Sequence, residues 1–359
     1  MRYREVVQRL TVNYLLEDTV LFGGVKVVFR QADLLARCGH HVRVVTTGGT
    51  PQWHDLEAEL VRVPAMRRDH VPPADIVVAT YWTTIEPALT MDAGEMVHYC
   101  QGFEGSYTHN RDQHPLIDAV YGHPLPAMVV APHLATLLGA RFGRPARTVL
   151  QPLESFFRPL AVWRRPRRPA AKPRILVTSP FEIDWKGVRT ALEAVRRLRR
   201  RGSNCELVRL SQWPLSNDER AILEADEFHC HLRPADVVRL MRSCHLLLAP
   251  SWQQEGFGLP VLEAMACGVP TVASDIDAFR DWTDGAAPLV PAEDPDALAE
   301  AAFEVLRSPS RWRELRDHGL QVAGRYSEQR ATASAERALA WVVGGGWREE
   351  LPTAGHRAD

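Results

Sequence analysis

The chain has 359 residues, 45% of them hydrophobic and 24% charged, with a formal net charge of -1 at pH 7. This composition is typical of a globular protein, and the length predicts two domains. Both features exclude a disulfide-stapled miniprotein and wholesale disorder, and no apolar run is long enough to predict a membrane-spanning helix.

The first half of the sequence alternates apolar runs with segments of helical periodicity. A strand at 10–16 is followed by a glycine turn, a helix that ends at Gly39 and a second strand at 41–47. This order is a βαβ unit, which builds parallel sheets. Residues 1–160 are therefore predicted to form one doubly wound, Rossmann-like domain. Its further strands are expected at 74–80, 96–100, 127–131 and 147–150.

A proline- and arginine-rich stretch at 161–174 has no apolar period and predicts an exposed linker. The alternation then restarts and predicts a second Rossmann-like α/β domain at 175–342, whose last helix is free to pack back on the first domain. Residues 343–359 are expected to form a flexible tail. In the second domain we expect strands at 175–179, 205–210, 245–251 and 269–274, and helices at 187–202, 234–244, 259–268, 295–307 and 310–342.

The most informative loop follows the strand at 245–251, because ligands bind at the carboxyl ends of strands in open parallel sheets. The sequence SWQQEGFGLPVLEAMACGVP places Glu255 before, and Glu263 inside, a helix that begins near Gly258. The unpaired amides and positive dipole end of such a helix form an anion pocket, and glycine lets a phosphate approach the backbone. The alternative is a tight turn with two solvent-facing glutamates.

Lys186 and a glycine pair are further candidates. Lys186 is one of three lysines among 43 basic residues, and it stands between a strand and a helix, within reach of a bound diphosphate. The alternative is a solvated surface lysine. Gly23 and Gly24 follow the first strand without the GxGxxG spacing of dinucleotide-binding turns, so they indicate at most a close approach to a phosphate or a sugar.

Taken in order, three stretches resemble the family-4 retaining glycosyltransferases of the GT-B fold, the glycosyl transferases group 1. These stretches are LLEDTVLFGGVKVVFRQADLLARCGHHVRVVTTG, SPFEIDWKG and APSWQQEGFGLPVLEAMACGVPTVASD. The resemblance implies two facing Rossmann-like domains with the active site in the cleft. It also implies a nucleoside diphosphate sugar as donor and no metal or other cofactor, since a lysine and helix-end amides neutralise the leaving diphosphate.

The resemblance also assigns roles to individual residues. It implies that Glu263 holds the ribose, that Glu255 contacts the donor sugar, and that Gly23 and Gly24 close over the donor. The diphosphate is held by Lys186 together with the backbone of three residues. These residues are Phe257, Gly258 and Leu259.

Two positions depart from the family pattern. Phe181 stands where an arginine usually accompanies Lys186, so a fixed cation is missing unless another arginine replaces it. Gln101 stands after the strand 96–100, where many members have a histidine. Gln101 can position the acceptor or the sugar by hydrogen bonds but cannot act as a base. Candidates for a catalytic group of the first domain are Glu104, His98 and His109.

The segment 229–245, HCHLRPADVVRLMRSCH, contains ligand types that suit zinc, but its spacing matches no familiar zinc motif. We therefore expect no metal there. By the resemblance, the nucleobase rests at the edge that runs from His231 to Pro234 and includes Arg233. The six cysteines show no CxxC pair and are expected to be buried, reduced thiols.

The distribution of charge indicates which partners to expect. Residues 161–220 contain 15 basic and 6 acidic residues, whereas residues 221–359 contain 13 and 22, which favours a local anionic ligand over nucleic-acid binding by the whole protein. The arginines at 196–201 are expected to be a solvated helix face, and with those at 164–168 they are candidates for contact with an anionic membrane. Because the first residues are charged, we expect a cytoplasmic protein, with the inner membrane face as an option.

The expected activity is transfer of a hexose from a nucleoside diphosphate sugar to a hydroxyl acceptor with retention of configuration. Two alternatives remain open from the sequence: a sugar-nucleotide 2-epimerase of the same architecture, and a non-catalytic protein that binds nucleotide sugars. The second is motivated by Phe181 and Gln101, which stand where charged or titratable groups are usual.

Overall fold

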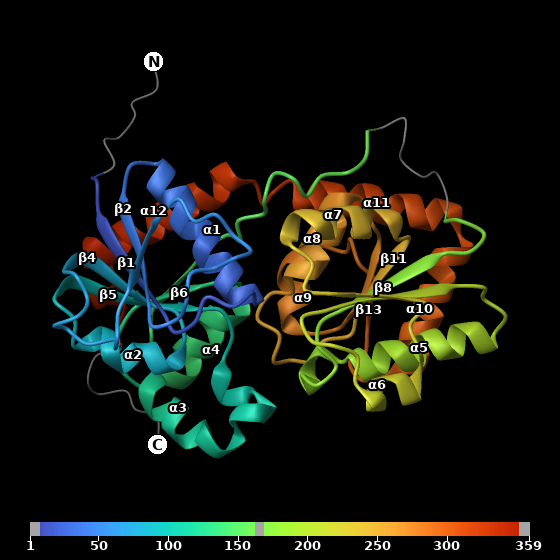
Figure 1. Cartoon of the computed structure of the whole chain (residues 1–359), viewed down its shortest axis with the longest axis horizontal. Helices are drawn as coiled ribbons and strands as arrows, with labels where there is room; N and C mark the ends of the chain where they lie inside the picture. The colour runs from blue at the N-terminus through green and yellow to red at the C-terminus, as the bar shows by residue number, and fades with distance from the viewer. Residues whose placement is uncertain (1–7, 162–168, 352–359) are drawn as a thin grey trace. The chain divides into compact units, whose positions relative to one another are not determined.

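The computed structural model describes residues 8–161 and 169–351 and divides the chain into two compact units (Figure 1). Unit 1 is Met1–Pro152 with Glu328–Asp359, and unit 2 is Leu153–Ser327. Each unit is a parallel sheet with helices on both faces. The predicted fold class of two doubly wound α/β domains is therefore confirmed.

The sheet of unit 1 has the order β3-β2-β1-β4-β5-β6-β7, and every neighbouring pair is parallel. Strand order reverses between β1 and β4, which makes their carboxyl ends the topological switch point where such sheets bind ligands. The strands are β1 (Thr11–Leu16), β2 (His41–Thr46), β3 (Glu59–Arg62), β4 (Ala74–Ala79), β5 (Ala93–Cys100), β6 (Ala127–Val129) and β7 (Ala146–Thr148).

Helices cover both faces of this sheet, α1 and α12 on one side and α2, α3 and α4 on the other (Figure 1). The sheet is thus buried on both faces, which explains its nearly continuous apolar strands. The helices are α1 (Gly23–Arg37), α2 (Trp82–Leu89), α3 (His114–Tyr121), α4 (Pro132–Phe142) and α12 (Glu328–Val343), with short 3-10 turns η1 (Glu104–Ser106), η2 (Thr108–Gln113) and η5 (Gly346–Glu350).

The end of the chain differs from the expectation. The single helix expected at 310–342 is broken after Gly324. Its second part, α12, packs on α1 and β5 of unit 1, as the expectation for the last helix allowed. The domains therefore end at Pro152 and Ser327 instead of 160 and 342. The tail expected from 343 onward is ordered up to 351: Trp347 is buried, and Arg348 Nη2 lies 2.8 Å from Glu95 Oε1. Residues 352–359 lie outside the described part.

The sheet of unit 2 has the order β10-β9-β8-β11-β12-β13 and is likewise parallel. Its switch point lies between β8 and β11. The strands are β8 (Arg174–Thr178), β9 (Glu206–Ser211), β10 (Glu227–Cys230), β11 (Leu246–Ala249), β12 (Thr271–Ser274) and β13 (Leu289–Val290). Most of the expected linker, residues 162–168, lies outside the described residues.

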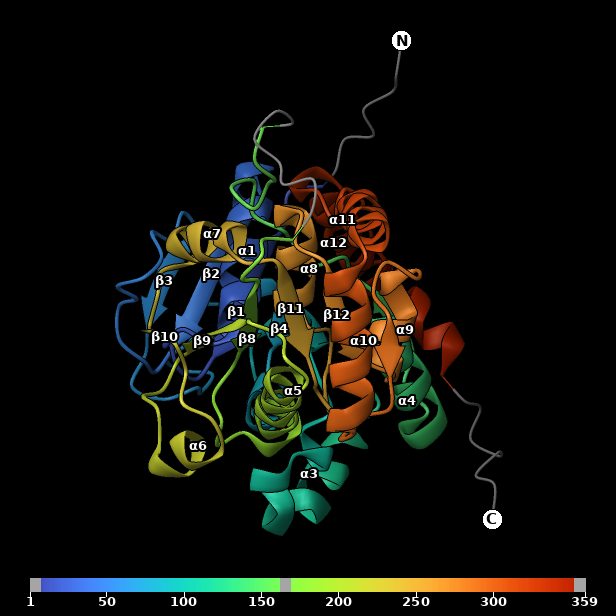
Figure 2. The same cartoon turned by 90° about the vertical axis from the view of Figure 1, so that its right-hand side faces the viewer.

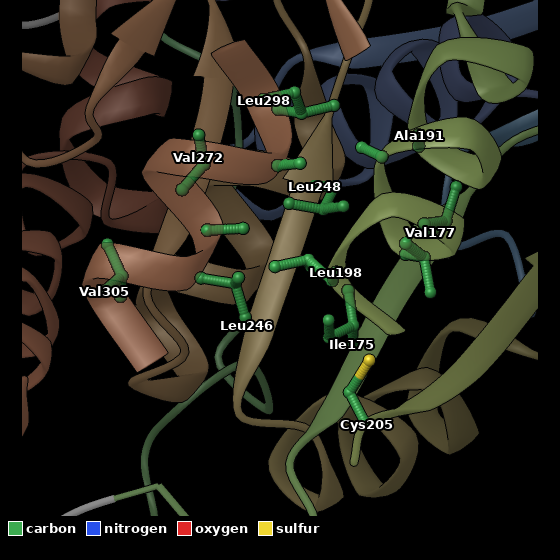
Figure 3. Packing of buried hydrophobic residues seen from close by; sticks show 14 of the residues in the cluster. Ile175, Val177, Ala191, Leu198, Cys205, Leu246, Leu248, Val272, Leu298 and Val305 are labelled. Atoms are coloured by element: carbon green, nitrogen blue, oxygen red, sulfur yellow. The ribbon is translucent and has the colours of Figure 1, made fainter. Parts of the chain in front are cut away.

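Helices α7, α8 and α11 cover one face of this second sheet, and α5 and α10 cover the other (Figures 1 and 2). Between the sheet and α5 and α10, aliphatic side chains such as Ile175, Leu248 and Leu298 form a tight core (Figure 3). The helices are α5 (Val188–Arg200), α6 (Asn217–Ile222), α7 (Pro234–Ser243), α8 (Leu259–Cys267), α9 (Asp277–Thr283), α10 (Pro295–Arg307) and α11 (Pro309–Ala323), and η4 (Asp184–Lys186) precedes α5.

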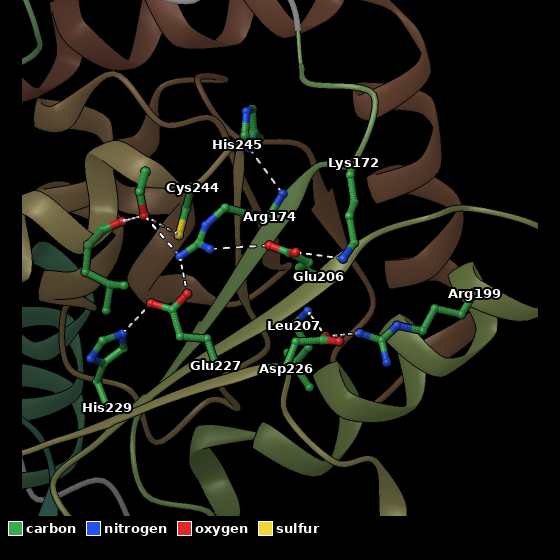
Figure 4. Close-up of polar contacts among 12 residues, drawn as sticks. Lys172, Arg174, Arg199, Glu206, Leu207, Asp226, Glu227, His229, Cys244 and His245 are labelled. Carbon is green, nitrogen blue, oxygen red and sulfur yellow. Dashed lines mark hydrogen bonds and ion pairs between the residues drawn. The ribbon is translucent and has the colours of Figure 1, made fainter.

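A polar network occupies the amino ends of these strands, opposite to the ligand-binding edge (Figure 4). Arg174 Nη2 lies 2.7 Å from Glu227 Oε2, and Glu227 in turn lies 2.6 Å from His229 Nε2. The ring of His245 accepts the Arg174 amide at 3.1 Å. Two histidines of the 229–245 segment therefore have partners in this network, and in the described ranges no three His, Cys, Asp or Glu side chains come together as a metal would require.

The six cysteines are free thiols, as expected, but only four are buried: Cys38 is exposed and Cys230 is partly exposed. Because burial disfavours the thiolate, the pKa of Cys100 is raised to about 12. Among the helices of the described residues, none is both long enough and apolar enough to cross a membrane.

Candidate functional site

Two loops meet at the switch point of unit 2, one after β8 and one after β11. The backbone N–H of Trp252 donates to the carbonyl of Trp185 at 2.8 Å and joins the loops. Gly187 allows their close approach: it has φ +64°, and a Cβ there would lie 2.0 Å from the Pro250 carbonyl oxygen. A residue without a side chain is therefore required at the start of α5.

Lys186 and Glu255 face each other across this junction. Lys186 Nζ donates to Glu255 Oε2 at 2.7 Å, and the Ser251 hydroxyl donates to the same oxygen at 2.9 Å. Burial alone would raise the pKa of Glu255, but Lys186, Ser251 and the Phe257 amide outweigh it and lower that pKa. Glu255 is thus a carboxylate at neutral pH. The Lys186 ammonium also lies 4.2 Å from the ring centroid of Trp185, within the range of a cation–π contact.

The start of α8 supplies backbone donors beside this ion pair. Gly258 has φ +85°, and a Cβ there would lie 2.3 Å from the ring of Phe279. Within the part of the chain that the structure describes, the amides of Gly258 and Leu259 have no hydrogen-bond acceptor. Two N–H groups at the positive end of a helix are thus available to an anion, as the anion pocket requires.

Phe257 holds this turn in place with its side chain. Its ring stacks on Trp282 with centroids 4.8 Å apart, and the Trp282 indole donates to the Phe257 carbonyl at 3.0 Å. The Phe257 amide donates a hydrogen bond to the carboxylate of Glu255. Of the three backbone amides expected to hold a diphosphate, that of Phe257 already donates to Glu255, whereas those of Gly258 and Leu259 have no acceptor among the described residues.

Glu263 is the fifth residue of α8, and its side chain is buried. Glu255 and Glu263 are only 7% and 8% exposed, so the alternative of two solvent-facing glutamates is wrong. His231 and Arg233 lie apart from them, at the carboxyl end of the edge strand β10. Both are exposed, His231 adopts φ +55°, and Arg233 Nε donates to Asp236 at 3.0 Å.

In unit 1 the structure brings two predicted residues together at the carboxyl edge. Gly23 and Gly24 open α1 after β1, and Gln101 directly follows β5. Gln101 Nε2 donates to the Gly24 carbonyl at 3.3 Å, and a Cβ on Gly24 would lie 3.3 Å from that same nitrogen. The sequence indicated each position separately, whereas their contact follows from the strand order.

Among the described residues, the other catalytic candidates of unit 1 form no hydrogen bond with Gln101 or Gly24. Glu104 is 3% exposed and accepts the hydroxyl of Tyr121, and His98 is completely buried. Their expected role as groups that touch a substrate is therefore not supported by their positions. His109 is exposed, and partial burial lowers its pKa. We find no contact of His109 with Gln101 or Gly24 among the described residues.

Two arginines that contact the segment between β8 and Lys186 were not singled out from the sequence. The guanidinium of Arg189 lies 5.3 Å from the centroid of Phe181, the residue at the expected arginine position. Arg209, in β9, is fully buried and donates to the carbonyl of Ser179 at 2.9 Å. An arginine inside the apolar run CELVRL was the available signal for Arg209.

The expected membrane contact through arginines finds little support in α5. Three arginines of this helix end pair with carboxylates instead of facing outward unpaired. These are Arg197 with Glu193 and Asp296, Arg199 with Asp226, and Arg201 with Glu300. The second cluster, at 164–168, lies outside the described residues.

Comparison with known proteins agrees with the resemblance. Residues 172–308 match the family model of the glycosyl transferases group 1. A phosphatidyl-myo-inositol mannosyltransferase of Mycolicibacterium smegmatis is 30% identical over 192 residues, 51% of this chain and 49% of that protein. An MMP alpha-(1->4)-mannosyltransferase of Mycolicibacterium hassiacum is 35% identical over 168 residues, 44% and 40% of the two chains. The chain thus spans about half the length of such relatives, or less.

Solved structures extend the likeness to both units. Sucrose-phosphate synthase from Thermosynechococcus elongatus superposes with a TM-score of 0.74 at 15% identity, covering 94% of this chain and 100% of that one. Anabaena HepE in complex with UDP-glucose gives 0.74 at 12% identity, covering 92% and 100%. At these identities the likeness concerns the fold, and it confirms the predicted GT-B fold. The predicted resemblance to the group 1 glycosyl transferases is likewise confirmed.

Proposed function

We propose that this protein is a retaining glycosyltransferase that moves a hexose from a nucleoside diphosphate sugar to a hydroxyl acceptor. The observation that carries the proposal is the ion pair of the partly exposed Lys186 with the buried Glu255, beside the available amides of Gly258 and Leu259. Together they offer an anion site and a fixed carboxylate at the switch point of unit 2. The group 1 match covers the same residues.

The chemistry follows from these charges. The bond between the anomeric carbon and the diphosphate oxygen breaks, leaving an oxocarbenium-like sugar and a diphosphate with one more negative charge. Lys186 and the two amides stabilise that charge, and Glu255 stabilises the cationic sugar. The acceptor oxygen forms its bond on the face that the diphosphate leaves, and its proton passes to the departing phosphate oxygen. Configuration is thereby retained.

The remaining residues bind and position the substrates. Glu263 accepts the ribose hydroxyls, and the edge at His231 and Arg233 receives the nucleobase. Gln101 and Gly24 act from unit 1 on the sugar or the acceptor. Lys186 and the amides neutralise the diphosphate without a metal ion, so we expect a chelator to leave the rate unchanged.

The names of the relatives favour a mannosyl donor within the hexose class, because several of them are mannosyltransferases. They lend no support to a 2-epimerase. The intact ion pair argues against a non-catalytic protein, since isolated binding would not require a buried carboxylate at the sugar. A bound nucleotide sugar is also consistent with the fold neighbour that was solved with UDP-glucose.

A panel of nucleotide sugars, GDP-mannose among them, tests the proposal through release of free nucleotide in the presence of hydroxyl acceptors. Lys186→Ala and Glu255→Gln should each lower turnover by at least about a hundredfold, because each removes a charge that acts in the transition state. Lys172→Ala and Glu206→Gln are the matched controls, since these residues form a similar 2.7 Å pair outside the site. The assignment would be refuted if the control variants lost as much turnover as Lys186→Ala and Glu255→Gln, or if Lys186→Ala and Glu255→Gln lost none.

A further inference from the structure

Arg209 forms an ion pair in the interior of unit 2. Its side chain is fully buried in β9, and its Nε donates to Glu219 Oε1 at 2.6 Å, where the carboxylate is also buried. Buried ion pairs are seldom the most stable choice, because an apolar pair of similar volume is often equally stable or more so. The pair is therefore poorly explained by core stability alone.

Arg209 also donates to the backbone at the end of β8. Nη1 donates to the carbonyl of Val177 at 2.7 Å and Nη2 to that of Ser179 at 2.9 Å. Ser179 is the first residue after β8 and adopts φ +87°, a left-handed conformation that is strained for serine. One guanidinium thus holds the strained residue at which the chain leaves the sheet.

Glu219 orients this guanidinium. It stands three residues after Ser216, which caps α6 by accepting the Glu219 amide at 3.2 Å. In this spacing the glutamate side chain commonly returns to the cap residue. Here it binds Arg209 instead. Arg209 is fully buried, and its Nε, Nη1 and Nη2 all donate to groups inside unit 2, so this arginine is not available as a second cation toward a diphosphate.

The loop between Ser179 and Lys186 is consequently held at both ends. At its far end the carbonyl of Trp185 accepts the Trp252 amide, and at its near end Arg209 holds Ser179. We propose that Arg209 is a positioning residue which, oriented by Glu219, anchors this loop so that Lys186 faces the diphosphate. The role of Lys186 in this statement rests on the proposed function.

Two variants separate positioning from simple packing. Arg209→Lys keeps a charge for Glu219, but a single ammonium cannot replace the planar fork that reaches both carbonyls. The double variant Arg209→Met with Glu219→Met removes the pair and leaves no buried charge behind, so we expect it to fold. Arg144→Lys, a buried arginine of unit 1 that also binds backbone carbonyls, is the matched control.

Hydrogen exchange of residues 179–187 tests the anchoring without any ligand. In both Arg209 variants we expect these amides to exchange at least about tenfold faster than in the wild type, while the amides of α10 keep the wild-type rates. In the Arg144→Lys variant we expect the amides of residues 179–187 to exchange at the wild-type rates. Exchange that stays unchanged in the 179–187 segment would overturn the proposal, whatever the nucleotide results. Acceleration throughout unit 2 would also overturn it, because it would show a general packing role.

Calorimetric titration with UDP, GDP, UMP and GMP then tests the consequence for binding. The Arg209 variants should lose about tenfold in affinity for the diphosphate that the wild type binds, and less than about threefold for its monophosphate. Equal losses for both ligands would contradict positioning of Lys186. A wild-type protein that binds none of the four would count against the proposed function, and hydrogen exchange would still decide the anchoring by Arg209.

Discussion

The burial of Glu104 leads to a specific dependence of stability on pH. Burial raises the pKa of this carboxyl from 4.5 to about 7, although the hydrogen bond from Tyr121 and the charge of Arg144 act in the opposite direction. Because the pKa in the folded state lies above that in the unfolded state, the folded protein binds the proton more tightly. The resulting stabilisation is fully present below about pH 4.5 and is lost as the pH rises through 7.

The size of the effect follows from the shift. At about 1.4 kcal/mol per pKa unit, the loss of stability between pH 5 and pH 8 is about 2 to 3 kcal/mol. Glu104→Gln keeps a neutral side chain that can still bond to Tyr121, so it should not show this loss. Relative to the wild type, the variant should therefore gain about 2 to 3 kcal/mol between pH 5 and pH 8.

Urea denaturation at four pH values from 5 to 8 measures this difference. The titratable and charged groups that interact with Glu104 are Tyr121, Cys100, Arg144 and Tyr81, and all are present in both proteins. Glu17→Gln serves as the control because its side chain is exposed to water. If the free energies of unfolding of the wild type and Glu104→Gln differ by an amount that stays constant within about 0.5 kcal/mol from pH 5 to pH 8, the reasoning is refuted.

Other substitutions test the backbone and the buried histidine. Gly187→Ala should destabilise unit 2 by more than about 2 kcal/mol in chemical denaturation, because φ is +64° and the Cβ would lie 2.0 Å from a carbonyl oxygen; unchanged stability would contradict the loop geometry. Gly24→Ala should lower turnover severalfold by displacing Gln101, yet leave the melting temperature equal or higher. Gly139→Ala is the control: because the space around Gly139 is open, it should raise stability and leave turnover unchanged. Equal turnover in the two variants would exclude a role for the contact between Gln101 and Gly24. Burial holds the pKa of His98 well below its usual value, so the stability that the neutral ring contributes is present above about pH 6.5 and is lost as the pH falls. His98→Leu should therefore lose less stability than the wild type between pH 7 and pH 5. Parallel plots of unfolding free energy against pH for the two proteins would disprove this.

Much of the architecture could be predicted from the sequence. Apolar runs such as 10–16 and 245–251 indicate buried parallel strands, and the segments between them have helical periodicity. Since ligands bind where parallel strands end, the same pattern directed attention to Lys186 and Glu255. The structure places both residues at the switch point between β8 and β11, with Lys186 Nζ 2.7 Å from Glu255 Oε2.

What tertiary structure alone decided is which partner each buried surface meets. The periodicity of 310–342 shows an apolar face and left the last helix free to pack on either domain. Only the tertiary structure shows that the helix breaks after Gly324 and that α12 packs on unit 1. A polar residue such as Glu104 is compatible with a surface site or with a buried hydrogen bond, and only the packing of Tyr121 settles it. Periodicity reports that a side chain is shielded from water. The partner depends on contacts between residues far apart in the chain, which no local pattern encodes.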